Sequence, residues 1–279
     1  MADLQFSFSA NAFRKHTFFE AADAISAAGY TGLEIMCDRP HAYPEDLSGQ
    51  DINLIKRKLA RKGLAIANLN AFMMCAVGNF HHPSWIEEDK DYRKLRIQYT
   101  KDCIDLAARL EVATLSTEPG GPLNVMRPDI ALEMFAEGLS LSADYALEKG
   151  VRILIEPEPG LLIQTSDEFI AFMDIIGHPG VGLNFDVGHF YCVNEDPAEK
   201  ISQLKDYIFH FHLEDIAESR NHRHILLGEG GIDIAGVLEA ITMIEYQGFI
   251  TVELYPYLDS AFETAKKARN YLKDVCGYG

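Results

Sequence analysis

The segment 181–187 reads VGLNFDV, a short apolar run that ends next to an acidic residue. The same order recurs at 152–158 (RILIEPE), 208–214 (IFHFHLE) and 249–255 (FITVELY). Short runs that are rich in β-branched and aromatic residues are typical of strands. Four earlier runs share this composition, so the sequence predicts eight strands in all, the others at 4–10, 32–36, 65–71 and 112–117.

Patterns of helical period fill the intervals between the predicted strands. Apolar residues recur at steps of three and four through 92–110, and 128–149 repeats the pattern after a helix start at Pro128-Asp129. Strands that alternate with helices favour parallel pairing through right-handed crossovers. Eight such units in 279 residues predict a (β/α)8 TIM barrel, and because no linker splits the chain, we expect 1–279 to be a single domain. A doubly wound open sheet is the alternative, although no glycine-rich phosphate loop follows the first predicted strand.

The chain is acidic, with a formal net charge of −17. Such a surface repels phosphate backbones and anionic lipids, so we expect neither nucleic acid nor a membrane as a partner. The five cysteines form no CxxC pair, which argues against a disulfide framework and against a thiolate zinc site. Met1–Leu4 lacks the profile of a signal peptide, and no apolar run approaches the roughly 20 residues that span a bilayer. These features predict a cytoplasmic protein.

Each of the last four predicted strands ends near a side chain that is costly to bury without a partner. These side chains are Glu156, Asp186, His212 and Glu253. The carboxyl ends of barrel strands converge on one small volume, where three carboxylates repel one another strongly. A divalent cation removes that repulsion, so the pattern predicts one metal ion. Three oxygens and one imidazole nitrogen suit manganese, our first choice, as well as magnesium or cobalt, and zinc also accepts such ligands.

At these positions the chain resembles the xylose isomerase-like TIM-barrel superfamily, which holds sugar and sugar-phosphate isomerases and epimerases and also endonuclease IV-type enzymes. The resemblance covers essentially the whole chain. It implies that Glu156, Asp186, His212 and Glu253 hold one divalent metal ion. It also implies that Glu156 and Glu253 are catalytic and move a proton through a metal-stabilised enediolate, as in a metal-dependent isomerase or epimerase of a sugar or sugar phosphate. The most specific motifs are IEPEPG (155–160), GLNFDVGH (182–189), FHLED (211–215), LLGEGGID (226–233) and VELYP (252–256).

Further residues are candidates for contact with a substrate. The family has a substrate-contacting histidine in the DxxH element that Asp186 begins here. Glu158 follows Glu156 at the spacing that places both on one side of a strand, although the neighbouring prolines disturb the alternation. The segment after the seventh predicted strand adds basic side chains. The predicted substrate-binding residues are therefore His189, Glu158, Arg220, Arg223 and His224.

Two long segments after predicted strands, 37–47 and 72–87, are expected at the mouth of the barrel, where such loops build active sites. His81-His82 in the second of them is a candidate lid element. Other side chains could line the pocket or pack inside the barrel. The polar members of this group are Glu34 and Asn68, and the aromatic members, expected as apolar walls, are Phe72, Trp85 and Tyr255.

Three other functions remain open. In the endonuclease IV branch, an Asp and a His after strand seven bind additional zinc ions; His224 fits this pattern, but His222 replaces the Asp. That branch also needs histidines after earlier strands, where this chain has Asn70 and Thr117-Glu118. A dehydratase or lyase could use the same metal site, because an enolate can expel a β-hydroxyl group. A non-catalytic sugar-binding barrel is the last alternative. Barrels of this kind often pair, so the chain could form a homo-oligomer.

Overall fold

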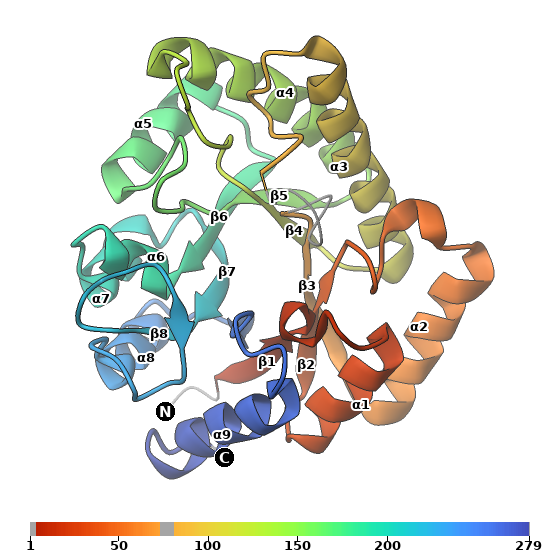
Figure 1. Ribbon diagram of the computed structural model, residues 1–279, viewed down its shortest axis with the longest axis vertical. Helices are drawn as coiled ribbons and strands as arrows, with labels where there is room; N and C mark the ends of the chain where they lie inside the picture. Colours follow the sequence, from red (N-terminus) through yellow and green to blue (C-terminus); the bar gives the residue numbers. More distant parts are fainter. Residues whose placement is uncertain (1–3, 73–80, 279) are drawn as a thin grey trace.

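The computed structural model describes residues 4–72 and 81–278, and within them eight parallel strands close into a barrel surrounded by helices (Figure 1). The strands pair around the barrel in the order β1-β10-β7-β6-β5-β4-β3-β2. This confirms the predicted (β/α)8 TIM barrel. The barrel strands are β1 (Gln5–Ser9), β2 (Gly32–Met36), β3 (Ala65–Asn70), β4 (Thr114–Thr117), β5 (Arg152–Ile155), β6 (Val181–Asp186), β7 (Ile208–Leu213) and β10 (Phe249–Val252).

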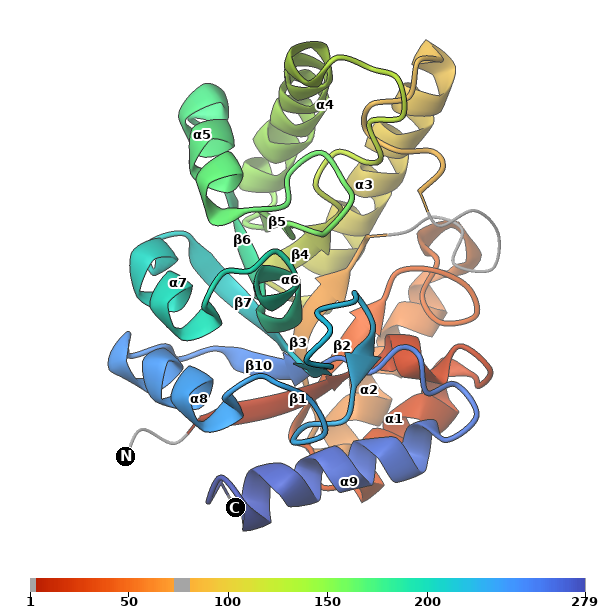
Figure 2. The same cartoon turned by 60° about the vertical axis from the view of Figure 1, so that its left-hand side comes forward.

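The helices lie on the outside of the barrel (Figures 1 and 2). Several begin at the residues that local chemistry favours: Thr17, Ser48 and Thr165 each cap a helix, and an acidic residue three positions later completes a capping box. The helices are η1 (Ala10–Phe13), α1 (Phe18–Ala27), η2 (Pro44–Asp46), α2 (Gly49–Lys62), α3 (Lys90–Leu110), α4 (Pro128–Glu148), α5 (Ser166–Ile176), α6 (Val187–Cys192), α7 (Pro197–Leu204), α8 (Ile234–Met243) and α9 (Ala261–Asp274).

The two faces of the strands differ sharply in chemistry. Apolar side chains such as Phe8, Ile153 and Phe211 face the helices and form the hydrophobic core. The interior carries polar side chains that bond to one another across strands: Ser7 Oγ lies 2.6 Å from Thr251 Oγ1, and His210 Nε2 lies 2.8 Å from the same hydroxyl. Because polar groups buried in a dry interior must find partners, this network holds the strand ends in fixed positions.

The predicted elements and the observed ones differ mainly at their ends. Strands β5 and β10 stop one residue before Glu156 and Glu253, so these two glutamates lie just beyond the sheet rather than within it. A short hairpin that the sequence did not predict, β8 (Asp215–Ile216) with β9 (His224–Ile225), follows β7 and lies beside α6 (Figure 2).

Of the expected long loop 72–87, residues 73–80 lie outside the described part of the chain. In the described residues, no helix has both the length and the apolar character needed to cross a bilayer.

Candidate metal centre

Four side chains from four neighbouring strands meet at the carboxyl end of the barrel. Glu156, Asp186, His212 and Glu253 each offer one ligand atom, and these atoms all lie within 4.8 Å of one another. His212 Nδ1 is 3.2 Å from a Glu156 oxygen, 3.7 Å from Asp186 Oδ2 and 3.6 Å from a Glu253 oxygen. All four residues are at most 5% exposed. The residues that the sequence places far apart therefore share one buried centre.

Amide side chains hold the two glutamates in place. Asn184 Nδ2 donates a hydrogen bond of 2.6 Å to Glu156 Oε2, and Asn11 Nδ2 donates one of 2.7 Å to Glu253 Oε1. Asn184 and Asp186 point to the same side of β6 because strand residues two apart share a face. Asn11 instead comes from η1, the turn that follows β1. Neither amide was predicted; alternation in β6 could have identified Asn184, whereas nothing in the sequence marks Asn11.

The turn from β6 into α6 explains the motif Asp186-Val-Gly-His189. Asp186 ends the strand and caps the helix, because its Oδ1 accepts a hydrogen bond of 2.8 Å from the backbone N–H of His189. The backbone N–H of Gly188 donates to the buried carboxylate of Glu214. A Cβ atom at position 188 would lie 2.3 Å from that carboxylate, so only glycine fits here.

The centre has an excess of negative charge. Burial, together with the neighbouring charge of Glu156, raises the pKa of Asp186 to about 7. Burial also raises the pKa of Glu253 well above its ordinary value, and the charges of Glu156 and Asp186 add to this. Burial alone would lower the pKa of His212, but the surrounding carboxylates raise it well above its usual range. One imidazole cannot balance three carboxylates, and this is the electrostatic condition that a cation relieves.

The donor set fits a divalent cation. Asp186 Oδ2 is buried and has no hydrogen-bond partner among the described residues, although it lies close to His212. A buried carboxylate oxygen without a donor is costly unless a cation neutralises it. Three carboxylates and one imidazole suit manganese, magnesium, cobalt or zinc. The four residues could therefore hold one such ion, which agrees with the expectation from the sequence without identifying the metal.

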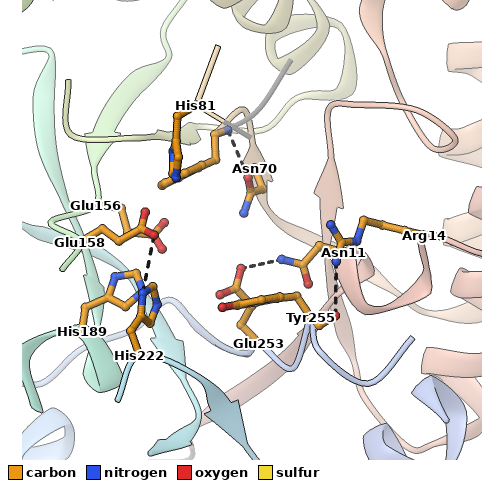
Figure 3. A pocket seen from close by; sticks show the side chains of 11 residues that line it. Asn11, Arg14, Asn70, His81, Glu156, Glu158, His189, His222, Glu253 and Tyr255 are labelled. Carbon is orange, nitrogen blue, oxygen red and sulfur yellow. Dashed lines mark hydrogen bonds and ion pairs between the residues drawn. The ribbon is translucent and has the colours of Figure 1, made fainter. Parts of the chain in front are cut away.

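A cavity of about 280 Å³ opens directly above this centre (Figure 3). Glu156 and Glu158 lie on one side of it with His189 and His222, while Glu253 lies on the opposite side. The volume is close to the lower end of small-molecule sites, roughly 300–1,000 Å³. Among the described residues, the lining consists of Asn11, Arg14, Asn70, Phe72, His81, Glu156, Glu158, His189, His222, Glu253 and Tyr255.

Two of the predicted substrate contacts, Glu158 and His189, line this cavity. Burial, followed by the charge of Glu156, raises the pKa of Glu158 well above its ordinary value. Burial lowers the pKa of His189, whose Nδ1 lies 2.9 Å from the Pro157 carbonyl oxygen. Because that carbonyl accepts a hydrogen bond from Nδ1–H, Nε2 of the neutral ring carries a lone pair that can accept a hydrogen bond from a substrate hydroxyl.

His224 lies behind the cavity lining, with its Nδ1 atom 2.9 Å from the Glu253 carbonyl oxygen. Burial lowers its pKa to about 3, so its ring is neutral near pH 7. Ring nitrogens of His189, His222 and His224 lie within 4.8 Å of one another, and this group could also hold a cation. His224 is not among the described residues that line the cavity, and its predicted contact with a substrate stays a prediction.

Arg220 and Arg223 do not line the cavity, contrary to the expectation from the sequence. Arg220 adopts a left-handed backbone conformation (φ 57°) in the turn after β8, which directs its side chain toward α6. There its guanidinium group lies 3.9 Å from the centre of the Tyr191 ring and donates to the Tyr191 carbonyl oxygen. Arg223 is exposed on the hairpin. The unpredicted hairpin therefore places both side chains outside the described lining, and their contact with a substrate stays a prediction.

The aromatic predictions were partly correct. Phe72 and Tyr255 line the cavity, as does His81, the candidate lid residue. Trp85 is buried below the surface, where its ring packs 5.8 Å from that of Phe135. Arg14, which also lines the cavity, was not predicted because it follows η1, outside any motif.

Comparison with known proteins agrees with the barrel fold. A family model described as xylose isomerase-like TIM barrel matches residues 22–275. Inosose dehydratase of Geobacillus thermodenitrificans is 26% identical over 94% of this chain and 90% of its own length. A D-tagatose 3-epimerase-like protein superposes with a TM-score of 0.80 at 23% identity, covering 98% of each chain. The IolI protein with a bound zinc atom gives a TM-score of 0.79 at 19% identity, again over 98% of each chain.

The first prediction concerns metal-dependent stability. Mn²⁺ at 100 times its dissociation constant should stabilise the folded protein by about 2.7 kcal/mol, and thermal denaturation with and without EDTA measures this. Asp186→Asn should lose most of that gain, because asparagine can still cap α6 but carries no charge. Asp89→Asn, at the exposed N-cap of α3, is the matched control and should respond to Mn²⁺ as the wild type does. An undiminished response in Asp186→Asn would contradict the assignment of Asp186 to the centre.

The second prediction concerns pH in the metal-free protein. The folded state holds the proton of Asp186 up to about pH 7, whereas an unfolded chain loses it near pH 4. The free energy of unfolding therefore decreases as pH rises between these values. Asp186→Asn lacks this loss of stability because asparagine does not ionise. The wild type and the variant contain the same histidines, so the comparison between them isolates Asp186. The melting temperature of metal-free Asp186→Asn minus that of the wild type should increase from about pH 5 to about pH 8; a constant difference would show that Asp186 is not destabilised by its neighbours.

Proposed function

Since the chain belongs to the xylose isomerase-like TIM-barrel family, we propose that it is a metal-dependent enzyme that removes a proton beside the carbonyl group of a small polyhydroxy ketone. The observation that carries this proposal is that Glu156 and Glu253 converge on one cation-compatible centre from opposite sides of a cavity (Figure 3). Two carboxylates so arranged can serve as proton acceptor and proton donor on a molecule held between them.

We further propose that the reaction is a dehydration. The resemblance seen in the sequence implies isomerisation or epimerisation first, with a dehydratase among the alternatives. Relatives that match 94% of this chain are named inosose dehydratase, which favours a lyase acting on a cyclic polyhydroxy ketone. The neutral imidazole of His189 and the amide of Asn70, both on the cavity wall, suit hydroxyl groups of such a ring.

The residues of the chain can carry out each proton transfer of this dehydration. One glutamate takes the proton from the carbon next to the carbonyl, and the electron pair of that C–H bond moves onto the carbonyl oxygen. A divalent ion, when bound, supplies positive charge close to that oxygen. The electrons then return to form a carbon–carbon double bond as the C–O bond at the next carbon breaks. The hydroxyl group leaves with a proton from a cavity carboxyl group, so the products are an unsaturated ketone and water.

Isomerisation or epimerisation is the second candidate, and it shares the first step. The position of the glutamates on two sides of the cavity favours it, because one can remove a proton and the other can return it to a different face or carbon. The two reactions differ only in what happens after the proton is removed: a hydroxyl group departs, or a proton comes back.

The third prediction tests the proposed dehydration and the role of Glu253 in removing the proton. The Mn²⁺-loaded protein should convert an inosose to a product that absorbs in the ultraviolet, and Glu253→Gln should reduce the rate by roughly 10²- to 10⁴-fold, the usual contribution of a general base. Glu263→Gln on the exposed face of α9 is the control and should be as active as the wild type.

The same incubation in deuterated water separates the candidates. Deuterium incorporation into recovered substrate or its epimer, without the absorbing product, would favour the isomerase or epimerase. Full activity in Glu253→Gln would contradict both. Ligand binding without turnover in the metal-loaded protein would instead support a non-catalytic sugar-binding barrel.

A further inference from the structure

Glu34 is a fully buried carboxylate inside the barrel that contacts His212 of the four-residue centre. It comes from β2, which is not adjacent in the barrel to any of the strands that lead to the four residues. Its Oε2 atom lies 2.9 Å from His212 Nε2. His212 therefore contacts carboxylates through both ring nitrogens: Glu34 through Nε2, and the centre through Nδ1.

The two sides of the His212 ring need opposite proton states. A neutral imidazole has one N–H donor and one lone pair, and only the lone pair can bind a metal ion. If Nε2 carries the proton and donates a hydrogen bond to Glu34, the lone pair of Nδ1 faces the centre that Glu156, Asp186 and Glu253 surround. A carboxylate behind a metal-binding histidine fixes its tautomer and orientation in this way and makes it a stronger ligand.

We propose that Glu34 is a positioning residue that holds His212 with Nδ1 toward the metal and thereby strengthens metal binding. This inference rests on the proposed function, because it requires the ion to occupy the four-residue centre. Glu34 itself is not among the residues that line the cavity.

Glu34 is held rigidly enough for this role. Ser9 Oγ donates a hydrogen bond of 2.8 Å to Oε1, and Asn68 Nδ2 donates one of 2.9 Å to Oε2. Asn68 Nδ2 also lies 3.1 Å from Ser116 Oγ, so the support extends over four adjacent strands, β1 to β4. The carboxylate is therefore fixed before any ion binds, which is the condition for preorganising a ligand.

His210 is another titratable side chain close to Glu34. Its Nε2 atom lies 3.6 Å from Glu34 Oε2 but only 2.8 Å from Thr251 Oγ1. The shorter contact makes the threonine its main partner, so Glu34 remains available to His212. Asn184 Nδ2 lies at 3.3 and 3.4 Å from the two ring nitrogens of His212 and donates its better hydrogen bond to Glu156. Glu34 is thus the strongest acceptor for the Nε2 proton.

The fourth prediction follows from this arrangement. Glu34→Gln keeps the volume but removes the charge, and it should weaken Mn²⁺ binding by roughly 10- to 100-fold, as measured by the electron paramagnetic resonance signal of free Mn²⁺. Ser142→Ala is the matched control, because it removes a buried hydrogen bond within α4, to the Gly138 carbonyl oxygen, and has no contact with Glu34 or His212. It should bind Mn²⁺ as the wild type does. Glu156→Gln provides the reference for the loss of a direct ligand.

The outcomes distinguish this inference from the proposed function. A wild-type protein that binds no Mn²⁺ would contradict the metal centre itself. Equal affinity in the wild type and Glu34→Gln would contradict only the role of Glu34. A loss in Glu34→Gln as large as that in Glu156→Gln would also overturn it, because Glu34 would then act as a ligand.

A second measurement does not depend on the variant folding. In the wild-type protein loaded with Zn²⁺, nitrogen-15 spectra of labelled histidine should show His212 with the metal on Nδ1 and a strongly hydrogen-bonded, downfield proton on Nε2. Protonation on Nδ1 with the metal on Nε2 would overturn the proposal. Ser142→Ala should leave this signal unchanged, whereas Glu34→Gln should move it upfield.

Discussion

Repulsion among three buried carboxylates is the constraint on which the rest of this structure depends. Glu156, Asp186 and Glu253 approach one another where the protein supplies a single imidazole against them. Burial makes each negative charge more costly, and proximity increases that cost further. A folded chain keeps such an arrangement only if something offsets it, and a divalent cation does so while also stabilising the negative charge that develops when a proton leaves a carbon beside a carbonyl.

The barrel makes this crowded centre possible by separating two kinds of packing. Apolar side chains lie between the strands and the helices, where they form the core. The interior is instead filled with hydrogen-bonded polar groups, such as Ser9, Asn68 and Thr251. Below the mouth, this network supports the side chains that face the cavity. The stability of the fold and the precision of the centre therefore come from different faces of the same strands.

Much of this could be predicted from the sequence. The strand runs and helical periods were sufficient for the barrel, and an acidic residue or histidine near each of four strand ends was sufficient to propose the centre. Local backbone geometry could not be predicted. No motif in the sequence indicates the hairpin that places Arg220 over Tyr191, or the turn that brings Asn11 to Glu253. The sequence indicates Glu34 as a polar residue near a strand end. Its contact with His212, however, depends on closure of the sheet, which no linear pattern contains.

Anomalous scattering from a crystal grown with Mn²⁺ is the most direct test of the central claim. We predict one strong peak at bonding distance, about 2.0–2.3 Å, from oxygens of Glu156, Asp186 and Glu253 and from Nδ1 of His212, close to the ligand distances known for such ions. Data from the same crystal at a wavelength beyond the manganese edge would identify the element. A crystal at saturating Mn²⁺ with no peak among these four side chains would contradict the account.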